Sequence, residues 1–513
     1  MRRMRLRTPA VLATLFLFAA ALGGRGSEGE PLRFVLLHTN DLHGQMLPRE
    51  ATWLDRQSPP RVGGFATIAA YVRDVREQGK RERFSVILVD AGDWFQGTPE
   101  GNRTKGAAVV GWMNLVGYEA ATLGNHEFDF GLGNLRSLLS LAKFPVLAAN
   151  VFDAKTGAPM RGLRPHAVVE RSGVRFAFVG ILTDATSEIT IAGATEGLRF
   201  GDEVETARSA VAAARREADL VFLLTHCGLE SDRALAAALP EVPLIVGGHS
   251  HKVLPQGERN GKTLLVQAGS KGGSIGRVEL AIDPETKAIR SASARLDDLL
   301  VDKFGEDLES SKLVARETEA VRVEIDAPVG VLLESLGRTT GLRSSSAGNL
   351  IADATREAAG AEIAFANKGG LRTALPAGPV TKRSFFELVP FENTIVSFTM
   401  TGAEIEEVLR ASVRGDGRSP LEVSGLLVRW REREGRKAQF LGAEVSGKPL
   451  EASRGYRVAV NSFLAGGGDR YPQFQKGRDS KDTGILLRDA AVEWVRKRSP
   501  YRPPVEDRFV RIP

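Results

Sequence analysis

The sequence predicts a two-domain α/β protein. Three observations carry this prediction: the chain has 513 residues, most of it alternates short apolar runs with helix-compatible stretches, and polar residues directly follow several of the apolar runs. One hydrophobic core rarely organises a chain of this length, so at least two domains are expected. Alternating strand and helix patterns indicate α/β layering with a largely buried sheet. The 42% hydrophobic and 26% charged content is ordinary for a soluble globular protein.

The N-terminus has the pattern of a secretory signal peptide, expected over residues 1–25. Four arginines precede an apolar run at 10–22, and glycines and a serine follow it. The run is short for a membrane span, which needs about 20 residues, although a retained N-terminal anchor is the alternative. We therefore expect an exported protein, periplasmic or secreted, without a stable membrane anchor after signal removal. Sec and twin-arginine export both stay open.

Charge and cysteine content narrow the class of protein. For a mature chain that starts near residue 22, loss of Arg2, Arg3, Arg5 and Arg7 lowers the formal net charge from +6 to +2. The charge therefore gives no reason to expect a nucleic-acid polymer as a partner. Cys227 is the only cysteine. No internal disulfide is possible, and the fold must depend on its hydrophobic core.

The first domain is expected over residues 30–302, as an α/β sandwich of β-sheets flanked by helices. Apolar runs predict strands at 34–37, 84–89, 146–149, 176–181, 220–224, 244–246 and 264–266. Helical patterns lie between them at 65–76, 110–115, 135–141 and 206–217.

A charged, helix-compatible stretch follows, and we expect a linker helix within residues 303–334. The alternative is a solvated face of the first domain. A smaller α/β domain for substrate binding is expected over residues 335–513. Its predicted helices lie near 349–359, 403–411 and 485–498, and its predicted strands near 363–366, 395–398 and 457–460.

Five strands of the first domain, one of them a further apolar run at 120–123, are followed by residues that commonly bind metal ions. In open α/β sheets, ligands bind beyond the carboxyl ends of the strands, so distant segments can converge on one site. Five of the seven histidines fall at these ends, which makes a chance placement improbable. The candidate ligands are Asp41, His43, Asp93, Asn125, His226, His249 and His251.

These seven candidates are more than one tetrahedral ion needs. They fit two divalent ions, of zinc, manganese or a similar metal, that share one bridging carboxylate. Asp93 is the natural bridge because a carboxylate has two oxygens to share. Glycines beside the ligands, such as Gly92 and Gly248, permit tight turns and close backbone approach.

The segment after Asn125 indicates acid–base chemistry. His126 follows Asn125 directly, and Asp129 is within reach of its imidazole if a turn begins at Glu127. A histidine oriented by a carboxylate can stabilise developing charge or protonate a leaving oxygen. We expect His126 and Asp129 to form a catalytic dyad; the alternative is that Asp129 caps a helix.

These motifs resemble those of the 5′-nucleotidase/UDP-sugar hydrolase family of dinuclear metallophosphoesterases. Their order and spacing agree with the family through most of the first domain, and further motifs are similar to its C-terminal substrate domain. The first-domain motifs begin at His38, Asp90, Gly124, Thr225 and Gly248, and the second-domain motifs begin at Gly348, Asn367, Pro390 and Ser462.

The resemblance implies an exported, metal-dependent hydrolase that cleaves phosphate esters of nucleotides by in-line attack of a metal-activated water. It implies a 5′-nucleotidase and leaves hydrolysis of UDP-sugars and nucleotide pyrophosphates open. One ion would be held by Asp41, His43, Asp93 and His251, and the other by Asp93, Asn125, His226 and His249.

The resemblance also implies how a small-molecule nucleotide is bound. Phe391 and Phe463 would sandwich the nucleobase, since two aromatic faces suit a flat ring. Asn393 and Asp469 would contact the nucleoside. Phosphate would be bound by Arg343, Asn367 and Arg372, in keeping with the match between guanidinium and phosphate geometry.

The sequence departs from the family pattern in places. Lys368 stands where the family usually has glycine, and its cation could point toward the substrate phosphate or toward solvent. Several members have glutamine at the position of His251, which leaves the metal open. Arg338 competes with Arg343 for the assigned phosphate contact.

Three other functions stay open at this point. A 2′,3′-cyclic-nucleotide 2′-phosphodiesterase/3′-nucleotidase resembles the same family. A sulfur-oxidation thiohydrolase shares the scaffold, but the Phe391 and Phe463 pair favours a nucleobase. A non-catalytic exported nucleotide-binding or adhesive protein is the alternative of another class. The sequence does not indicate the preferred nucleotide or the oligomeric state.

Overall fold

The computed structural model describes residues 29–51, 53–55, 57–191, 193–415, 418–433 and 436–513. The expected signal peptide, residues 1–25, lies outside this part of the chain. Among the described residues, none of the helices has the length and apolar character to cross a membrane.

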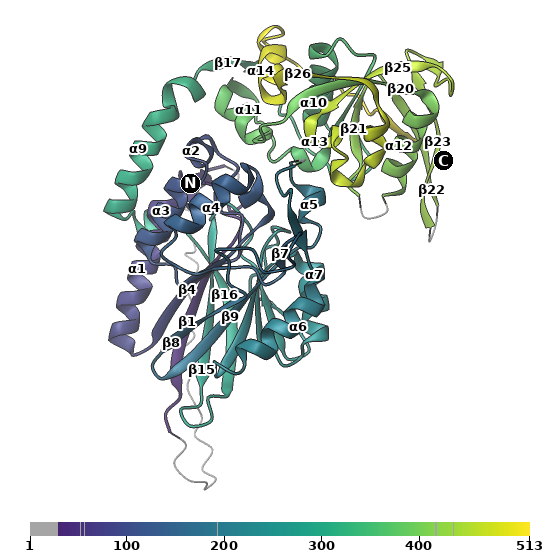
Figure 1. Cartoon of the computed structure of the whole chain (residues 1–513). Helices are drawn as coiled ribbons and strands as arrows, with labels where there is room; N and C mark the ends of the chain where they lie inside the picture. Colours follow the sequence, from purple (N-terminus) through teal and green to yellow (C-terminus); the bar gives the residue numbers. More distant parts are fainter. Residues whose placement is uncertain (1–28, 52, 56, 192, 416–417, 434–435) are drawn as a thin grey trace, which may run out of the picture.

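The N-terminal part contains two six-stranded sheets that pack face to face (Figure 1). The first sheet has the order β16-β15-β1-β4-β5-β6, in which β1 and β4 to β6 are parallel. Its strands are β1 Leu32–Thr39, β4 Ser85–Asp90, β5 Ala120–Thr122, β6 Val146–Leu147, β15 Ser274–Ile282 and β16 Ile289–Asp298.

The second sheet has the order β13-β14-β12-β11-β9-β8, with β9, β11, β12 and β14 parallel. Its strands are β8 His166–Arg171, β9 Val174–Leu182, β11 Leu220–His226, β12 Leu244–Gly247, β13 Glu258–Asn260 and β14 Thr263–Val266. Apolar side chains of both sheets form one core, in which the rings of Phe34 and Phe176 meet edge to face at 5.0 Å.

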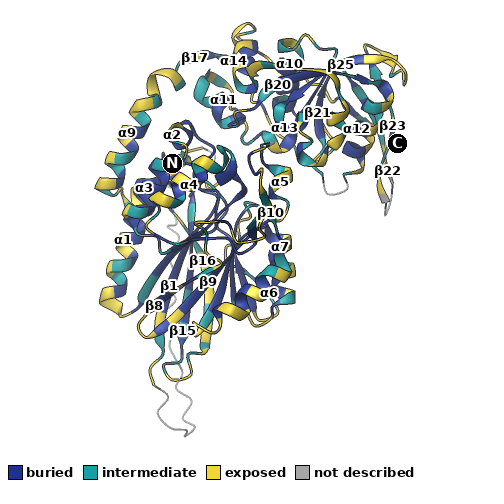
Figure 2. Ribbon diagram, in the orientation of Figure 1, coloured by how far each residue is buried: buried dark blue, intermediate teal, exposed yellow. Residues whose placement is uncertain are grey.

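Helices cover the outer faces of both sheets. The amphipathic helices α1 Phe65–Glu82, α3 Ala107–Val116 and α4 Gly131–Leu141 pack on the first sheet. The helices α6 Glu203–Ala214 and α7 Leu229–Ala238 pack on the second. Figure 2 shows the result: the strands are mostly buried, while the outward faces of the helices are exposed. The predicted α/β sandwich of sheets flanked by helices is confirmed.

The hairpin of β15 and β16, which pairs with β1, was not among the predicted strands. The prediction relied on continuous apolar runs, which are typical of strands buried on both faces. β16 instead alternates partly buried and exposed residues because one of its faces is solvated. Period-two alternation was therefore the signal that could have found it.

The helix α9, Leu308–Ile325, leads from the N-terminal part, which we call the first body, to the C-terminal part, the second body (Figure 1). It begins at the N-cap Asp307, whose side chain accepts a hydrogen bond from the Ser310 amide. Its buried residues Ser310, Val314 and Glu317 face the first body, and Glu317 forms an ion pair with Arg103. The strand β17, Pro328–Leu332, follows it.

The C-terminal part is built on a five-stranded sheet of order β21-β18-β25-β20-β26. Its strands are β18 Ile363–Asn367, β20 Thr394–Thr401, β21 Leu421–Ser424, β25 Gly455–Asn461 and β26 Arg478–Leu486. The helices α10 Ser346–Ala358 and α14 Leu487–Arg496 share one core with this sheet, and α12 Gly402–Arg414 shares another. A four-stranded sheet adds β22 Leu427–Arg433, β23 Arg436–Val445, β24 Lys448–Pro449 and β27 Phe509–Arg511.

The two bodies meet at the end of the first where the parallel strands terminate. The Gln96 side-chain amide donates to the Pro390 carbonyl at 3.1 Å. Ion pairs join Arg383 to Glu100 at 2.6 Å and Arg470 to Glu188 at 3.1 Å. Loops of the second body are thereby held over the predicted metal ligands of the first.

Candidate active site

The loops after β1, β4, β5, β11 and β12 bring the seven predicted metal ligands together. The cluster contains two groups of three residues, and in each group the ligand atoms all lie within 4.8 Å of one another. The first group is Asp41, His43 and His251, and the second is Asp41, Asp93 and His226. Distances within the groups include 3.2 Å from His251 Nε2 to Asp41 Oδ1 and 3.1 Å from His226 Nε2 to Asp93 Oδ2.

Asn125 and His249 complete the cluster beside the second group. His249 Nδ1 lies 3.0 Å from Asn125 Oδ1. The rings of His226 and His249 meet edge to face at 5.2 Å. The His249 backbone amide also donates to Asp41 Oδ1 at 3.1 Å. The donor set is therefore carboxylate, imidazole and amide oxygen, which suits borderline divalent ions such as zinc and manganese.

Five of the seven ligands have left-handed backbone conformations. Their φ values are 51° for Asp41, 49° for His43, 59° for Asp93, 73° for His249 and 53° for His251. Such conformations cost free energy outside glycine and persist where the surrounding structure enforces them, commonly at functional sites. The backbone is thus bent to aim these side chains inward.

The ring of His226 is oriented for coordination. Its Nδ1 lies 2.7 Å from the Ala91 carbonyl, so Nδ1 donates there and Nε2 faces the cluster. Nε2 is buried and makes no hydrogen bond. A β-carbon at Gly92 or Gly248 would approach His226 Nδ1 to 2.7 Å, so glycine is needed at both positions. A buried nitrogen without a hydrogen bond, facing two carboxylates, fits a metal ligand.

The charges of the cluster favour a cation. Burial alone would raise the pKa of Asp41, but His251 and His226 lower it to about 2. Burial would lower the pKa of His226, but Asp93 and Asp41 raise it to about 10. Carboxylates that hold a proton on His226 so strongly would also attract a divalent ion in its place. Burial lowers the pKa of His249 to about 4, which favours the neutral ring that binds metals.

His126 and Asp129 form the predicted pair. His126 Nδ1 lies 2.8 Å from Asp129 Oδ2, and both side chains are buried. Burial opposes charge on the ring, but Asp129 and Asp93 raise the pKa of His126 above its ordinary value. The N-cap residue of helix α4 is Phe130, so Asp129 does not cap that helix. Its carboxylate contacts His126 instead.

Two buried carboxylates that the sequence analysis did not single out hold the ligand loops. Glu127 accepts hydrogen bonds from the backbone amides of Asp93 at 3.1 Å, Trp94 at 2.8 Å and Gly124 at 2.6 Å. Asp90 accepts from the Gly92 amide at 2.8 Å and from Thr39 Oγ1 at 2.6 Å. Both residues could have been noticed in the sequence, because they are acidic residues inside the motifs that start at Asp90 and Gly124.

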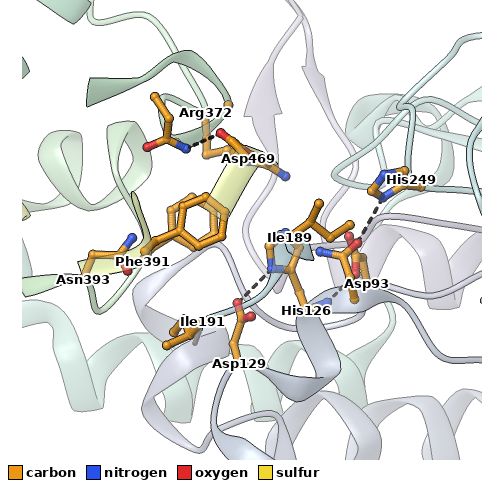
Figure 3. Close-up of a pocket in the computed structure, with 15 residues that line it drawn as sticks. Asp93, His126, Asp129, Ile189, Ile191, His249, Arg372, Phe391, Asn393 and Asp469 are labelled. Carbon is orange, nitrogen blue, oxygen red and sulfur yellow. Dashed lines mark hydrogen bonds and ion pairs between the residues drawn. The ribbon is translucent and has the colours of Figure 1, made fainter. Parts of the chain in front are cut away.

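A pocket of about 770 Å³, including its open mouth, adjoins the ligands (Figure 3). It is lined by residues of both bodies, including six of the seven predicted substrate-binding residues: Asn367, Arg372, Phe391, Asn393, Phe463 and Asp469. Ile189, the last residue of the short helix α5 (Thr186–Ile189), and Ile191 just after it also line the pocket. They were not predicted, because isolated apolar residues carry no recognisable motif.

The second body places its polar groups toward the ligands. Arg372 Nη2 lies 3.3 Å from His43 Nε2, and its guanidinium carbon is 5.7 Å from the centroid of Phe391. The ring of Phe391 lies 5.5 Å from that of His126. The Asn367 side-chain amide donates to Asp469 Oδ2 at 2.9 Å.

Arg343 is the predicted residue that the structure does not bring to this pocket. Its side chain is 82% exposed, with Nε 3.5 Å from Asp507. Arg338, the competing candidate, instead donates from Nη1 to the Arg372 carbonyl at 3.0 Å. Arg343 was assigned to the phosphate from its distance along the sequence before the predicted helix. That distance does not determine the direction in which the side chain of a loop residue points.

Comparison with known proteins agrees with this arrangement of two bodies around one site. Residues 34–253 match the calcineurin-like phosphoesterase family, and residues 328–476 match the 5′-nucleotidase C-terminal domain. The chain belongs to the 5′-nucleotidase family of metallophosphoesterases.

Proteins related to this 5′-nucleotidase family member match it over nearly its full length. Protein UshA of Yersinia enterocolitica is 26% identical over 544 residues, which cover 96% of each chain. A 5′-nucleotidase of Vibrio cholerae is 26% identical over 548 residues, covering 96% of this chain and 95% of its own. The crystal structure of a 5′-nucleotidase precursor from Thermus thermophilus has a TM-score of 0.83 at 29% identity, covering 94% of this chain and 99% of that one.

Membership in the 5′-nucleotidase family makes the protein a hydrolase of phosphoric ester bonds. It also implies divalent metal ions, and the clustered ligands fit them.

Proposed function

We propose that the protein is an exported, metal-dependent 5′-nucleotidase. One observation carries the proposal: a single pocket joins the metal-ligand cluster of the first body to two phenylalanines and a set of polar side chains from the second. Divalent ions held by the cluster would bind a phosphate group, and the aromatic pair suits a flat base. Export rests on the N-terminal pattern of residues 1–25.

Two divalent ions, zinc or manganese, would be held in this cluster. Asp41, His43, Asp93 and His251 would hold one, and Asp93, Asn125, His226 and His249 the other. A bound divalent ion lowers the pKa of a coordinated water and so supplies hydroxide near neutral pH for in-line attack on phosphorus.

The side chains around the cluster would bind and orient the phosphoryl group. His126, which Asp129 holds at 2.8 Å, would offset the negative charge that develops on the phosphoryl and leaving oxygens. Arg372 approaches His43 to 3.3 Å and can offer its guanidinium to the same oxygens. Phe391 and Phe463 would hold the base, while Asn393 and Asp469 contact the nucleoside.

The substrate class is tested by hydrolysis of a panel of phosphate compounds in the presence of manganese. Products are separated by chromatography, because opening a cyclic diester or cleaving a pyrophosphate releases no inorganic phosphate; phosphate release is measured in addition for the monoesters. The panel is AMP, UMP, UDP-glucose, 2′,3′-cyclic AMP and para-nitrophenyl phosphate. The proposal expects AMP or UMP to have the highest kcat/KM. Preference for the cyclic nucleotide would instead identify a cyclic phosphodiesterase, and no hydrolysis of any ester would indicate a binding protein.

Replacing Phe391 by leucine is expected to raise KM for AMP about 10-fold, because stacking of a base on an aromatic ring contributes roughly 1–3 kcal/mol. Leucine keeps apolar bulk beside His126 but removes the flat face. The measurement is steady-state kinetics with AMP and with para-nitrophenyl phosphate, which has no nucleoside. An equal loss with both substrates would contradict a role in base binding.

A further inference from the structure

The loop Asn367–Arg372, which consists of the end of β18 and the 3₁₀ turn after it, carries several pocket residues, but Lys368 and Leu371 do not line the pocket. Asn367, Gly369, Gly370 and Arg372 line the pocket, whereas Lys368 does not. The Lys368 side chain is only 4% exposed. Its cation therefore points neither to the phosphate nor to solvent, the two directions that the sequence left open.

Lys368 Nζ binds two acceptors inside the second body. It lies 2.8 Å from Glu422 Oε1 and donates to the Arg343 carbonyl at 2.8 Å. Glu422 is fully buried on β21, whose register places it opposite Ala366, two residues before Lys368. Lys368 is thus the countercharge of a carboxylate that has no access to water.

The same carboxylate also holds the start of α10. Glu422 Oε1 accepts from Ser345 Oγ at 2.6 Å and from the Ser345 amide at 3.2 Å. Ser345 is the N-cap of α10 and accepts from the Gly348 amide at 3.0 Å. A β-carbon at Gly348 would collide with the Glu422 side chain. The network therefore joins the loop Asn367–Arg372, β21 and α10, and the side chain of Glu422 is tightly packed against the start of α10.

Few side chains besides Lys368 hold the loop between Asn367 and Arg372: Leu371 is buried in the core that includes α10, and the two residues before it are glycines. Asn367 is fixed by Asp469 at 2.9 Å and by Asn461 at 2.9 Å. Gly369 and Gly370 follow, and a glycine backbone is held only by its own hydrogen bonds. Lys368 stands between the fixed Asn367 and the glycines that lead to Arg372.

We propose that Lys368 is a positioning residue: its buried pair with Glu422 sets the loop that presents Asn367, the two glycines and Arg372 to the substrate. Breaking one partner of a buried pair leaves an uncompensated charge, whereas neutralising both is far better tolerated. Substrate binding should therefore be weakened when only one partner is neutralised and should recover when both are neutralised, because the substrate does not contact Lys368 itself. This inference rests on the proposed nucleotide substrate.

The test compares Lys368→Met, Glu422→Gln and the double variant K368M/E422Q in AMP hydrolysis by the metal-loaded, full-length protein. Each single variant is expected to raise KM about 10-fold. The fall in kcat is expected to be smaller than for loss of His126, because the metal ligands and His126 belong to the other body and only Arg372 of this segment would reach the phosphoryl oxygens. The double variant is expected to return KM to within about threefold of the wild type, since coupled partners are not additive.

A matched control separates positioning from general destabilisation. Arg478→Met breaks the pair of Arg478 with Glu404 at 2.8 Å, on β26 and α12, which contribute no pocket residue. It should leave KM unchanged. Thermal unfolding of all variants reports stability separately, so a lowered Tm with unchanged KM in both single variants would overturn the proposal.

Two other outcomes are decisive. A raised KM in K368M with no change in E422Q would mean that Lys368 acts on the substrate directly, which overturns the proposal. If a single variant does not fold, Ser345→Ala replaces it; losing one hydrogen bond to Glu422 should raise KM about threefold, and an unchanged KM would overturn the proposal. A wild-type protein without activity on AMP would refute the proposed function instead.

Discussion

Replacing Asp93 by asparagine is expected to lower kcat for AMP by about 1,000-fold, because several kcal/mol of charge stabilisation would be lost with the bridging carboxylate. Asp93 Oδ2 lies 3.1 Å from His226 Nε2 and 3.8 Å from His43 Nε2, so it faces ligands of both proposed ions. A neutral amide keeps the shape but offers only one oxygen. The measurement is phosphate release at saturating AMP, together with the metal content of the purified variant.

The matched control for this change is Asp74→Asn. Asp74 is an exposed carboxylate on α1 that pairs with its neighbour Arg73 at 3.0 Å, and its loss should leave kcat unchanged. A folded Asp93→Asn protein that keeps more than about a tenth of the wild-type kcat would contradict the bridging role, since such a loss is only about 1.4 kcal/mol.

Replacing His126 by alanine is expected to lower kcat by about 100- to 10,000-fold, the range typical of losing a positioned acid–base group. KM should change little, because the proposal assigns the nucleoside to other residues. Asp129 and Asp93 raise the pKa of His126 against the effect of burial, which favours the charged ring that the proposed role requires. Kinetics at saturating and limiting AMP separate the two parameters.

His166→Ala is the control for the His126 variant. His166 lies on β8, 3.4 Å from Glu217, and lines no part of the pocket. Its removal should not alter kcat. If His126→Ala kept full kcat with AMP while the metal content stayed normal, the assigned role of the dyad would be wrong.

The parallel strands and the ligand loops could be predicted because both follow from local sequence. A continuous apolar run ending in Asp41 or His226 marks a buried strand and places the polar residue at its carboxyl end. Within each sheet, parallel topology brings these ends to one edge. That both sheets present this edge to the same site follows from how the sheets pack, which no local pattern records. The left-handed conformations of the ligands were indicated only indirectly, by the glycines beside them.

Other features depend on long-range contacts that no local pattern records. Glu127 holds the loops after β4 and β5 through three backbone amides, although its own motif marks only His126 and Asp129. Lys368 is buried because Glu422, distant in sequence, lies beside it. Arg343 is exposed because its side chain pairs with Asp507 near the C-terminus. Predicting these directions requires the packed structure.

The central claim, that distant loops form one site for two divalent ions serving hydrolysis, is tested most directly by titrating manganese into chelator-treated protein. The titration follows metal bound per chain and phosphate release from AMP together. The account predicts no activity without metal, saturation at two ions per chain, and full activity only as the second ion binds. Full activity of the metal-free protein, or saturation at a single ion, would contradict it.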